Sequence, residues 1–480
     1  MEMMFKNKPA FKEIDSVKLM YNVGALLDIP TGNYILGKHG ESILNGGLGV
    51  ITAIAGRGNT YKSTIAHYMM LSAANSVAAS GYSPYMNTYD TEMNISVDRL
   101  ATFSKTFSSF KDIDVMKEKM WSITDKTQHM GNEWYEILKT FLKGDKLKNK
   151  KDYMVDTPFI DPEGKVIRTV FPTFGEIDSI SEFETADIQE IQNKNELGDS
   201  GGNTIHMRLG LAKTRLLMEL PSLCNSSAHY MLMTAHLGTD MNIGAGPYAT
   251  PTKKLQHMKM GDKIKGVTDK FFFLPNLFWQ TVSSTNLINQ GTKGPEYPKN
   301  RDNDEANSGD LNLVTIRQLR NKSGPSGVNI EIIVSQTEGV LPSLTEFHYL
   351  KENGRFGLDG NLVNYSLTLL PDVKIGRTTV RQTIDSNPKL RRAIKITADL
   401  LQMKQFWRHL DLKIPEPKEF YELLSKKYDW DVLLDTRDWW TFKNDTADKN
   451  FLSTMDLVKM SRGEYHPYWY DAAVKQKKKA

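Results

Sequence analysis

Short apolar runs alternate with longer segments of helical periodicity through the middle of the chain. The runs VITAIAG (50–56) and SPYMNTYDTE (83–92) have the length and composition of strands, and STIAHYMMLSAANSVAAS (63–80) lies between them with a helical pattern. Further strands are predicted within 166–181, 228–237, 271–284, 311–320 and 328–336, and helices from about 94 and over 207–223. Because strands alternate with helices, we expect an α/β fold with a mostly parallel sheet covered on both faces.

The pattern divides the 480 residues into three parts. Residues 1–48 form an entry segment, and 49–370 an α/β core with a lysine-rich, mostly helical insertion at about 105–165. Residues 375–480 hold five of the eight tryptophans and end in a basic tail, so we expect a small, mainly helical C-terminal domain there. Its aromatic residues either recognise a mediator protein or fill a small core.

Composition indicates where the protein is expected to act but says little about its function. Apolar residues make up 40% and charged residues 25%, and a net charge of +4 is too small to name a partner. The single cysteine, Cys224, excludes an internal disulfide and fits a reducing cytoplasm. No run reaches the roughly 18 apolar residues of a membrane span, so we expect a cytoplasmic protein that makes no membrane contact.

A glycine-containing loop joins the first predicted strand to its helix. Residues 56–64 read GRGNTYKST, the spacing of a phosphate-binding loop with Tyr61 at its second glycine. In such loops backbone N–H groups hold the phosphates, a lysine reaches the β and γ positions, and a hydroxyl binds Mg²⁺. The alternative is a glycine turn before an ordinary helix. The predicted ATP-binding residues are Gly56, Arg57, Gly58, Asn59, Thr60, Tyr61, Lys62, Ser63 and Thr64, with Ser63 also a metal ligand.

Acidic residues end two of the later strands. Asp90 and Glu92 follow one run, and a carboxylate there can orient or deprotonate the water that attacks the γ-phosphate. Asp178 ends another run and can hold Mg²⁺ beside Ser63 through water. Acidic residues at strand ends are common on protein surfaces, so each position alone is weak evidence.

Two cations, Arg320 and Lys322, follow the run LNLVTIRQLR. At a strand end they can reach a neighbouring subunit's γ-phosphate and stabilise the charge of the transition state. They can equally be the basic end of a surface hairpin.

Taken in order, these motifs resemble the RecA-like recombinase and helicase ATPases, and most of all the UvsX-type recombinases of T-even-like bacteriophages. That group also carries an aromatic residue before the loop lysine, as at Tyr61. The resemblance covers about residues 25–360. It implies that Glu92 is the catalytic base, Asp178 the magnesium aspartate and His236 the polar sensor at a strand tip. Lys62, and Arg320 and Lys322 acting across the subunit boundary, complete the implied catalytic set.

The resemblance also implies two DNA-contacting loops, at about 184–204 and 237–266. The first is acidic, and the second is the better candidate because its lysines lie among glycines and Tyr248 can stack on a base. A solvated lysine-rich surface is the alternative. The predicted DNA-binding residues are Tyr248, Lys253, Lys254, Lys259, Lys263 and Lys265.

Three functions compete. The first is a DNA-dependent ATPase that assembles head to tail on single-stranded DNA, uses ATP and Mg²⁺, and acts in phage recombination, repair or replication. The second is a hexameric DnaB-type replicative helicase, whose strand-then-turn motif resembles KSGPSG at 322–327. The third is a non-catalytic nucleotide-binding scaffold, which the joint presence of Glu92 and Asp178 disfavours.

Overall fold

A mixed sheet of ten strands forms the centre of the molecule. The computed structural model describes residues 18–194, 203–239, 253–291, 293–299, 309–361, 363–407 and 412–478. In spatial order the strands are β14 (Gly339–Val340), β13 (Asn329–Ser335), β12 (Leu311–Asn321), β11 (Leu277–Asn286), β3 (Ile51–Gly56), β9 (His229–Thr239), β8 (Thr173–Asp178), β4 (Met86–Asp90) and β5 (Trp121–Asp125). A short strand, β10 (Asp262–Ile264), pairs with β9.

The six strands from β11 to β5 are parallel, and the remaining strands pair in the antiparallel direction. β3, β4 and β8 are buried along their whole length, as expected for parallel strands covered on both faces. The prediction of a large, mostly parallel central sheet with helices is therefore confirmed.

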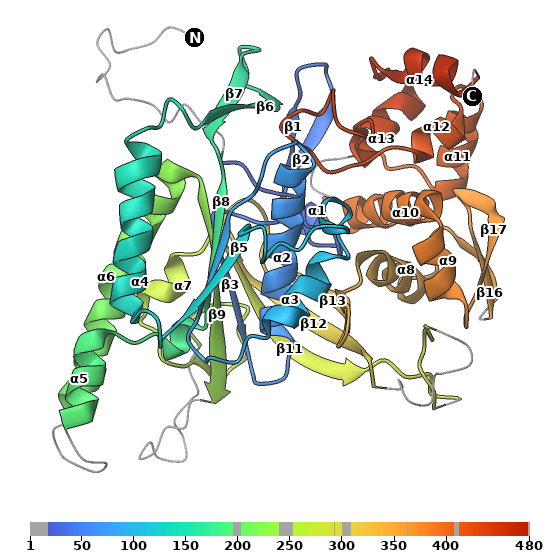
Figure 1. Cartoon of the computed structure of the whole chain (residues 1–480). Helices are drawn as coiled ribbons and strands as arrows, with labels where there is room; N and C mark the ends of the chain where they lie inside the picture. Colours follow the sequence, from blue (N-terminus) through green and yellow to red (C-terminus); the bar gives the residue numbers. More distant parts are fainter. Residues whose placement is uncertain are drawn as a thin grey trace, which may run out of the picture.

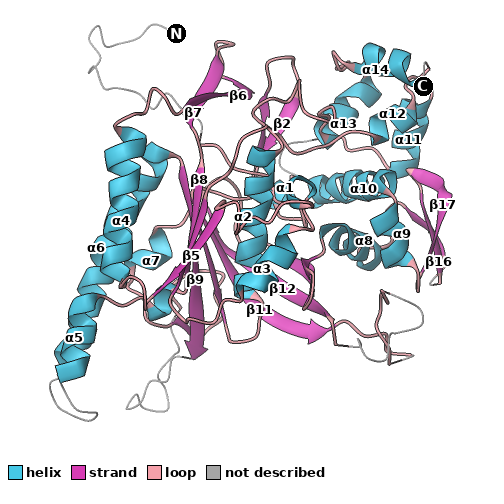
Figure 2. Ribbon diagram, in the orientation of Figure 1, coloured by secondary structure: helices cyan, strands magenta, loops and turns pink. Residues whose placement is uncertain are grey.

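Helices cover both faces of this sheet (Figures 1 and 2). One face carries α2 (Lys62–Ala78) and α3 (Val97–Ser104), and the other α4 (Gly131–Lys139) and α6 (Asn203–Ser227). Shorter helical segments are η1 (Ser108–Phe110), η2 (Thr140–Leu147), η3 (Ile180–Glu182), α5 (Ala186–Lys194) and α7 (Lys270–Phe273). Alanines and methionines of α2 pack against the sheet with almost no exposed surface, which fixes the start of this helix against the end of β3.

The segment expected as a helical insertion is of mixed structure, which corrects the prediction for 105–165. α4 and η2 lie in it, but β5 adds a parallel strand to the edge of the central sheet. β6 (Met154–Ile160) forms a hairpin with β7 (Val166–Val170) outside that sheet. The strand character expected within 166–181 corresponds to two strands, since Pro172 separates β7 from β8.

The beginning and the end of the described chain lie together beside the sheet. Near the beginning are α1 (Asp28–Thr31), β1 (Asn33–Leu36) and β2 (Ser42–Asn45). After β13 and β14 come α8 (Pro342–Glu352), the small sheet of β15 (Leu358–Gly360), β16 (Asn364–Leu367) and β17 (Leu370–Gly376), and then α9 (Val380–Ser386), α10 (Pro388–Phe406), α11 (Pro417–Ser425), α12 (Trp430–Leu434), α13 (Thr454–Arg462) and α14 (Tyr470–Lys477). No described helix has the length and apolarity needed to cross a membrane.

Trp440 connects these two ends. It is 1% exposed, stacks on Tyr21 at 4.8 Å between ring centroids, and donates its indole N–H to the Met20 carbonyl at 3.0 Å. Its side chain also packs edge-on against Phe159 of β6. The aromatic residues of the C-terminal region therefore include structural ones that fasten the segment leading into β3.

We predict that Trp440→Ala lowers the free energy of unfolding by about 3–5 kcal/mol, because it leaves a large cavity and an unpaired Met20 carbonyl. Thermal and denaturant unfolding of the full chain measure this. Met218→Ala, at a side chain 63% exposed on α6, is the control and should change stability by less than about 0.5 kcal/mol. Equal effects of the two substitutions would contradict the role given to Trp440.

Candidate functional site

The carboxyl ends of four parallel strands meet at one edge of the sheet. Gly56 of β3 lies opposite His236 of β9, and Asp90 of β4 opposite Asp178 of β8. β9 stands between β3 and β8, so all four strand ends are neighbours. In open α/β sheets ligands bind in the crevice beyond these ends. The loop at 56–64, the DTE motif formed by residues 90–92, and Asp178 are therefore brought together by strand order.

The loop between β3 and α2 has one position that only glycine can fill. A Cβ on Gly56 would lie 1.9 Å from the Thr281 hydroxyl oxygen and 2.7 Å from that of Thr60. The two threonine hydroxyls are themselves hydrogen-bonded at 2.6 Å, which holds them against Gly56. A Cβ on Gly58, by contrast, would meet nothing within 4 Å. Of the two glycines in GRGNTYKST, Gly56 is thus the one that packing requires.

Tyr61 occupies the backbone conformation for which glycine is usually chosen. It precedes α2 with φ 60° and ψ 21°, in the left-handed region. A side chain costs roughly 1–2 kcal/mol there, which is offset in part because the Tyr61 ring packs against the core. Lys62 follows as the first residue of α2 and is 8% exposed, and Ser63 is half-buried. The loop thus enters a 17-residue helix whose N-terminal N–H groups can bind an anion.

Asp90 organises the turn after β4. Its carboxylate accepts the backbone N–H groups of four successive residues, 92 to 95, at 2.8 to 3.0 Å. With its acceptor sites occupied in this way, Asp90 has a structural function. The turn that it holds presents the Glu92 side chain beyond the strand end.

Glu92 and His236 form the central pair of the site. Glu92 Oε1 lies 2.6 Å from His236 Nε2, and Asn94 donates to the other carboxylate oxygen at 3.1 Å. The hydrogen bond from His236 lowers the pKa of Glu92 to about 2, against the opposing effect of burial and with help from the charge of Lys62. Glu92 is therefore ionised at neutral pH and can accept a hydrogen bond from a water molecule.

Asp178 is fixed through threonines that the sequence did not single out. Its carboxylate accepts a short hydrogen bond from the Thr234 hydroxyl of β9. Thr91 donates its backbone N–H to the Asp178 carbonyl at 2.8 Å, and its hydroxyl bonds both the N–H and the carbonyl of Ser179. The middle residue of the DTE motif thus locks the ends of β4 and β8 together. A polar residue buried in an apolar strand, as Thr234 is, was the available signal.

Arg320 and Lys322 lie away from this edge. β12 is antiparallel to β11, and Asn321 pairs with Leu277, which in turn faces Thr52 near the start of β3. The two cations are thus placed at the opposite edge of the sheet from Lys62. Burial, and then the neighbouring charge of Arg320, lower the pKa of Lys322. Among the described residues, Arg320 Nε has no hydrogen-bond partner.

The predicted DNA-contacting residues are described only in part. Tyr248 and residues 195–202 of the first loop lie outside the described residues. The five lysines of the second loop are all exposed: Lys253, Lys254, Lys259, Lys263 and Lys265. Lys254 pairs with Asp269, and the side chain of Lys253 donates to the Gln256 carbonyl. All five lysines come after residues 240–252. Three of them precede β10, Lys263 lies in β10, and Lys265 directly follows it.

The ends of β9 and β10, which flank residues 240–252 and are called the stem below, are hydrogen-bonded to the candidate site. The backbone N–H of Lys265 donates to the His236 carbonyl, and Ser181 Oγ accepts the N–H of His236 and donates to the Lys265 carbonyl. Beside them the buried ammonium of Lys213 donates to the carbonyls of Ser181 and Gly266 at 2.8 and 2.7 Å. Burial lowers the pKa of Lys213 to about 8. Movement of this stem would therefore move His236.

We predict that Gly56→Ala disrupts the loop and that Gly58→Ala does not. The added methyl group collides with Thr281 and Thr60 at the first position, at a cost of about 1–3 kcal/mol, and meets open space at the second. Thermal unfolding and binding of a fluorescent ATP analogue measure the two effects. Tolerance of alanine at Gly56 would refute this account of the loop.

We predict that His236→Ala raises the pKa of Glu92 from about 2 toward its ordinary value of 4.5. In the wild type the stabilisation from ionised Glu92 is present above the unfolded-state pKa and is lost as the pH falls through the folded one. The alanine variant should lose most of this dependence between pH 4.5 and 2. Carbon-13 titration of the Glu92 carboxyl, assigned with Glu92→Gln, measures the change. A rise of less than about one unit would contradict the pairing.

Because comparison with known proteins gives no match, a functional assignment depends on the geometry of the candidate site. No protein-family model matches the chain, and no curated protein is significantly similar to it. The residues that support an assignment are those gathered at one edge of the sheet: the loop that ends at Lys62 and Ser63, the Glu92–His236 pair, and Asp178.

Proposed function

We propose that this chain is a RecA-like, DNA-dependent ATPase that assembles head to tail on single-stranded DNA and acts as a recombinase. The observation that carries the proposal is the meeting of a phosphate-type loop, an ionised glutamate held by a histidine, and a buried aspartate at one sheet edge. These are a binding element, a water-orienting element and a metal-binding element in neighbouring positions.

The residues present fit a nucleotide with Mg²⁺. Gly56 lets the loop pack against Thr281 and Thr60, where a Cβ would collide, and Lys62 starts the helix that follows this loop. The Ser63 hydroxyl and the Asp178 carboxylate, the latter through water, would hold the ion, and hydroxyl and carboxylate oxygens are ligands that Mg²⁺ prefers. When bound, Mg²⁺ neutralises charge on the β- and γ-phosphate oxygens.

Glu92 orients the attacking water in this mechanism. With a pKa near 2 it is a weak base, so its main contribution would be a fixed hydrogen-bond acceptor for the water that attacks the γ-phosphate. His236 positions Glu92, and Lys62 balances negative charge on the phosphates. As the bond from the water oxygen to the γ-phosphorus forms, the bond from that phosphorus to the β–γ bridging oxygen breaks and ADP leaves. The water proton passes to a γ-phosphate oxygen late in this loose transition state.

The position of Arg320 and Lys322 supports the proposed assembly. They lie at the opposite edge of the sheet from Lys62, so they cannot reach the phosphates bound by their own chain. Two neighbouring cations suit an anion supplied from outside, since the buried Nε of Arg320 has no partner among the described residues. In a head-to-tail contact, which is a heterologous interface, one chain's cations can meet the next chain's nucleotide.

DNA dependence is supported by the stem between β9 and β10. Exposed lysines that suit a phosphate backbone follow that segment, and its base is bonded through Ser181 and Lys265 to His236. Binding of single-stranded DNA to these lysines would thus act on a stem whose base holds the partner of Glu92. Hydrolysis is expected to rise when DNA is bound.

A mixing experiment tests the proposal. Lys62→Ala and Arg320→Ala should each abolish DNA-stimulated hydrolysis, whereas their equimolar mixture should recover roughly a quarter of it, because one interface in four pairs an intact Lys62 with an intact Arg320. The control is a mixture of Lys62→Ala with Glu92→Gln. These residues belong to the same side of the interface, so that mixture should stay inactive.

Three outcomes would count against the proposal. No recovery in the first mixture removes Arg320 from a shared site, and hydrolysis that DNA does not affect removes the DNA dependence. Displacement of a duplex strand by a closed hexamer, without strand exchange, favours the helicase. The result expected for a recombinase is strand exchange by long DNA-bound assemblies, whose formation is monitored by light scattering.

A further inference from the structure

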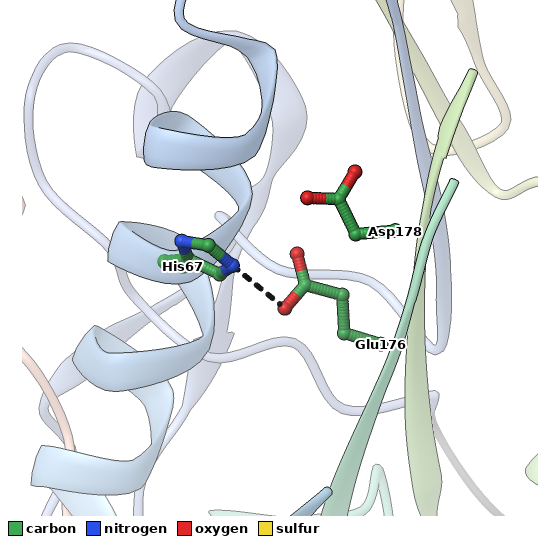
Figure 3. Close-up of side chains that lie close together, drawn as sticks. All are labelled: His67, Glu176 and Asp178. Carbon is green, nitrogen blue, oxygen red and sulfur yellow. Dashed lines mark ion pairs between the residues drawn. The ribbon is translucent and has the colours of Figure 1, made fainter. Parts of the chain in front are cut away.

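A histidine and two carboxylates meet behind the phosphate loop (Figure 3). His67 projects from α2 toward β8, which carries Glu176 and Asp178. His67 Nε2 lies 3.2 Å from Glu176 Oε2, and one ligand atom from each of the three residues lies within 4.8 Å of the other two. All three side chains are buried, with residue exposures of 6%, 0% and 4% in chain order.

The cluster has a polar atom left without a partner. The Thr88 hydroxyl donates to Glu176 Oε2 at 3.0 Å, and the Thr234 hydroxyl donates to Asp178. Glu176 Oε1 is fully buried and has no hydrogen bond among the described residues, whereas His67 Nε2 has Glu176 Oε2 as its ion-pair partner. In Figure 3 the second carboxylate oxygen of Glu176 points toward Asp178, into the space between the three side chains. A buried acceptor without a partner costs free energy that a bound cation would remove.

We propose that His67, Glu176 and Asp178 bind a divalent transition-metal ion, Zn²⁺ or Mn²⁺. One imidazole nitrogen and two carboxylates are a mixed nitrogen and oxygen ligand set that suits these ions, whereas Mg²⁺ prefers oxygen alone. The 3.2 Å between His67 and Glu176 is close to the ~3.3 Å that separates two ligands around a tetrahedral ion with bonds of ~2 Å.

The ion would join the helix of the phosphate loop to the strand that ends at Asp178. His67 follows Lys62 by five residues on α2, and Glu176 precedes Asp178 by two on β8. The ion is a second one, deeper than the Mg²⁺ of the proposed mechanism, and its ligands exist without nucleotide. The inference therefore does not rest on the proposed function.

Metal titration of the full chain tests it. Protein freed of metal with a chelator, without nucleotide or Mg²⁺, is titrated with Zn²⁺ by calorimetry, with Mn²⁺ by electron paramagnetic resonance, and with Co²⁺ as a coloured substitute. We expect one ion per chain, a raised Tm, and a Co²⁺ spectrum without thiolate charge-transfer bands, since the ligands are nitrogen and oxygen.

Variants locate the site. His67→Gln and Glu176→Gln should each weaken Zn²⁺ binding by roughly 100-fold or more. Loss of a residue that only supports a ligand typically costs about 10- to 100-fold in affinity, and loss of a ligand should cost at least as much. His229→Gln is the matched control, because His229 is equally buried in the sheet but bonds the Thr173 hydroxyl and lies near Lys146. It should bind as the wild type does.

Two results would overturn the inference. The wild type fails to bind one Zn²⁺ or Mn²⁺ per chain, or the His67 and Glu176 variants bind the ion as tightly as the wild type. The cluster would then be a buried hydrogen-bonded pair beside Asp178. If the variants do not fold, the nitrogen and oxygen signature of Co²⁺ in the wild type decides. Lys62→Ala separates the two proposals, since it should abolish hydrolysis and leave ion binding unchanged.

Discussion

Parallel pairing of β3, β9, β8 and β4 is the constraint on which the rest of the molecule depends. Residues that end these strands are far apart in sequence, and pairing places them at one edge. The pairing is stabilised beyond the ladder hydrogen bonds, because Thr91 and Ser179 bond across the ends of β4 and β8. A shift of register by one residue would turn Asp178 to the other face of the sheet and separate it from Thr234.

The negative charges of Glu92 and Asp90 at this edge are balanced by nearby hydrogen-bond donors and cations. Glu92 has His236 and Lys62 as partners, which lower its pKa and keep it ionised, whereas Asp90 accepts four backbone N–H groups. Glu176 is the exception, with one oxygen that no described residue satisfies. Buried polar groups usually have partners. Such an exception next to an imidazole and a second carboxylate is where a cation is expected.

Segments near both ends of the described chain pack against the segment that leads into β3, the first strand of the site. The segment leading into β3 is held by Trp440, and the amide of Gln402 on α10 donates to the Leu26 carbonyl. Lys477 of the basic tail pairs with Asp429 and Asp431, so this lysine is used within the fold. The C-terminal region therefore contributes to the packing on which the first strand of the site depends.

The local elements of the site were determined by the sequence alone. The apolar run before Gly56, the helix after Lys62 and the strand before Asp90 depend on periodicity over a few residues. The tertiary structure alone decided that His236 pairs with Glu92, that Asp90 holds a turn, that β5 joins the main sheet, and that Arg320 and Lys322 lie at the far edge. It alone brought His67 of a helix against Glu176 of a strand, 109 residues later in the numbering. Such contacts depend on strand order and direction, which are set by packing between distant segments and leave no periodic signal in the chain.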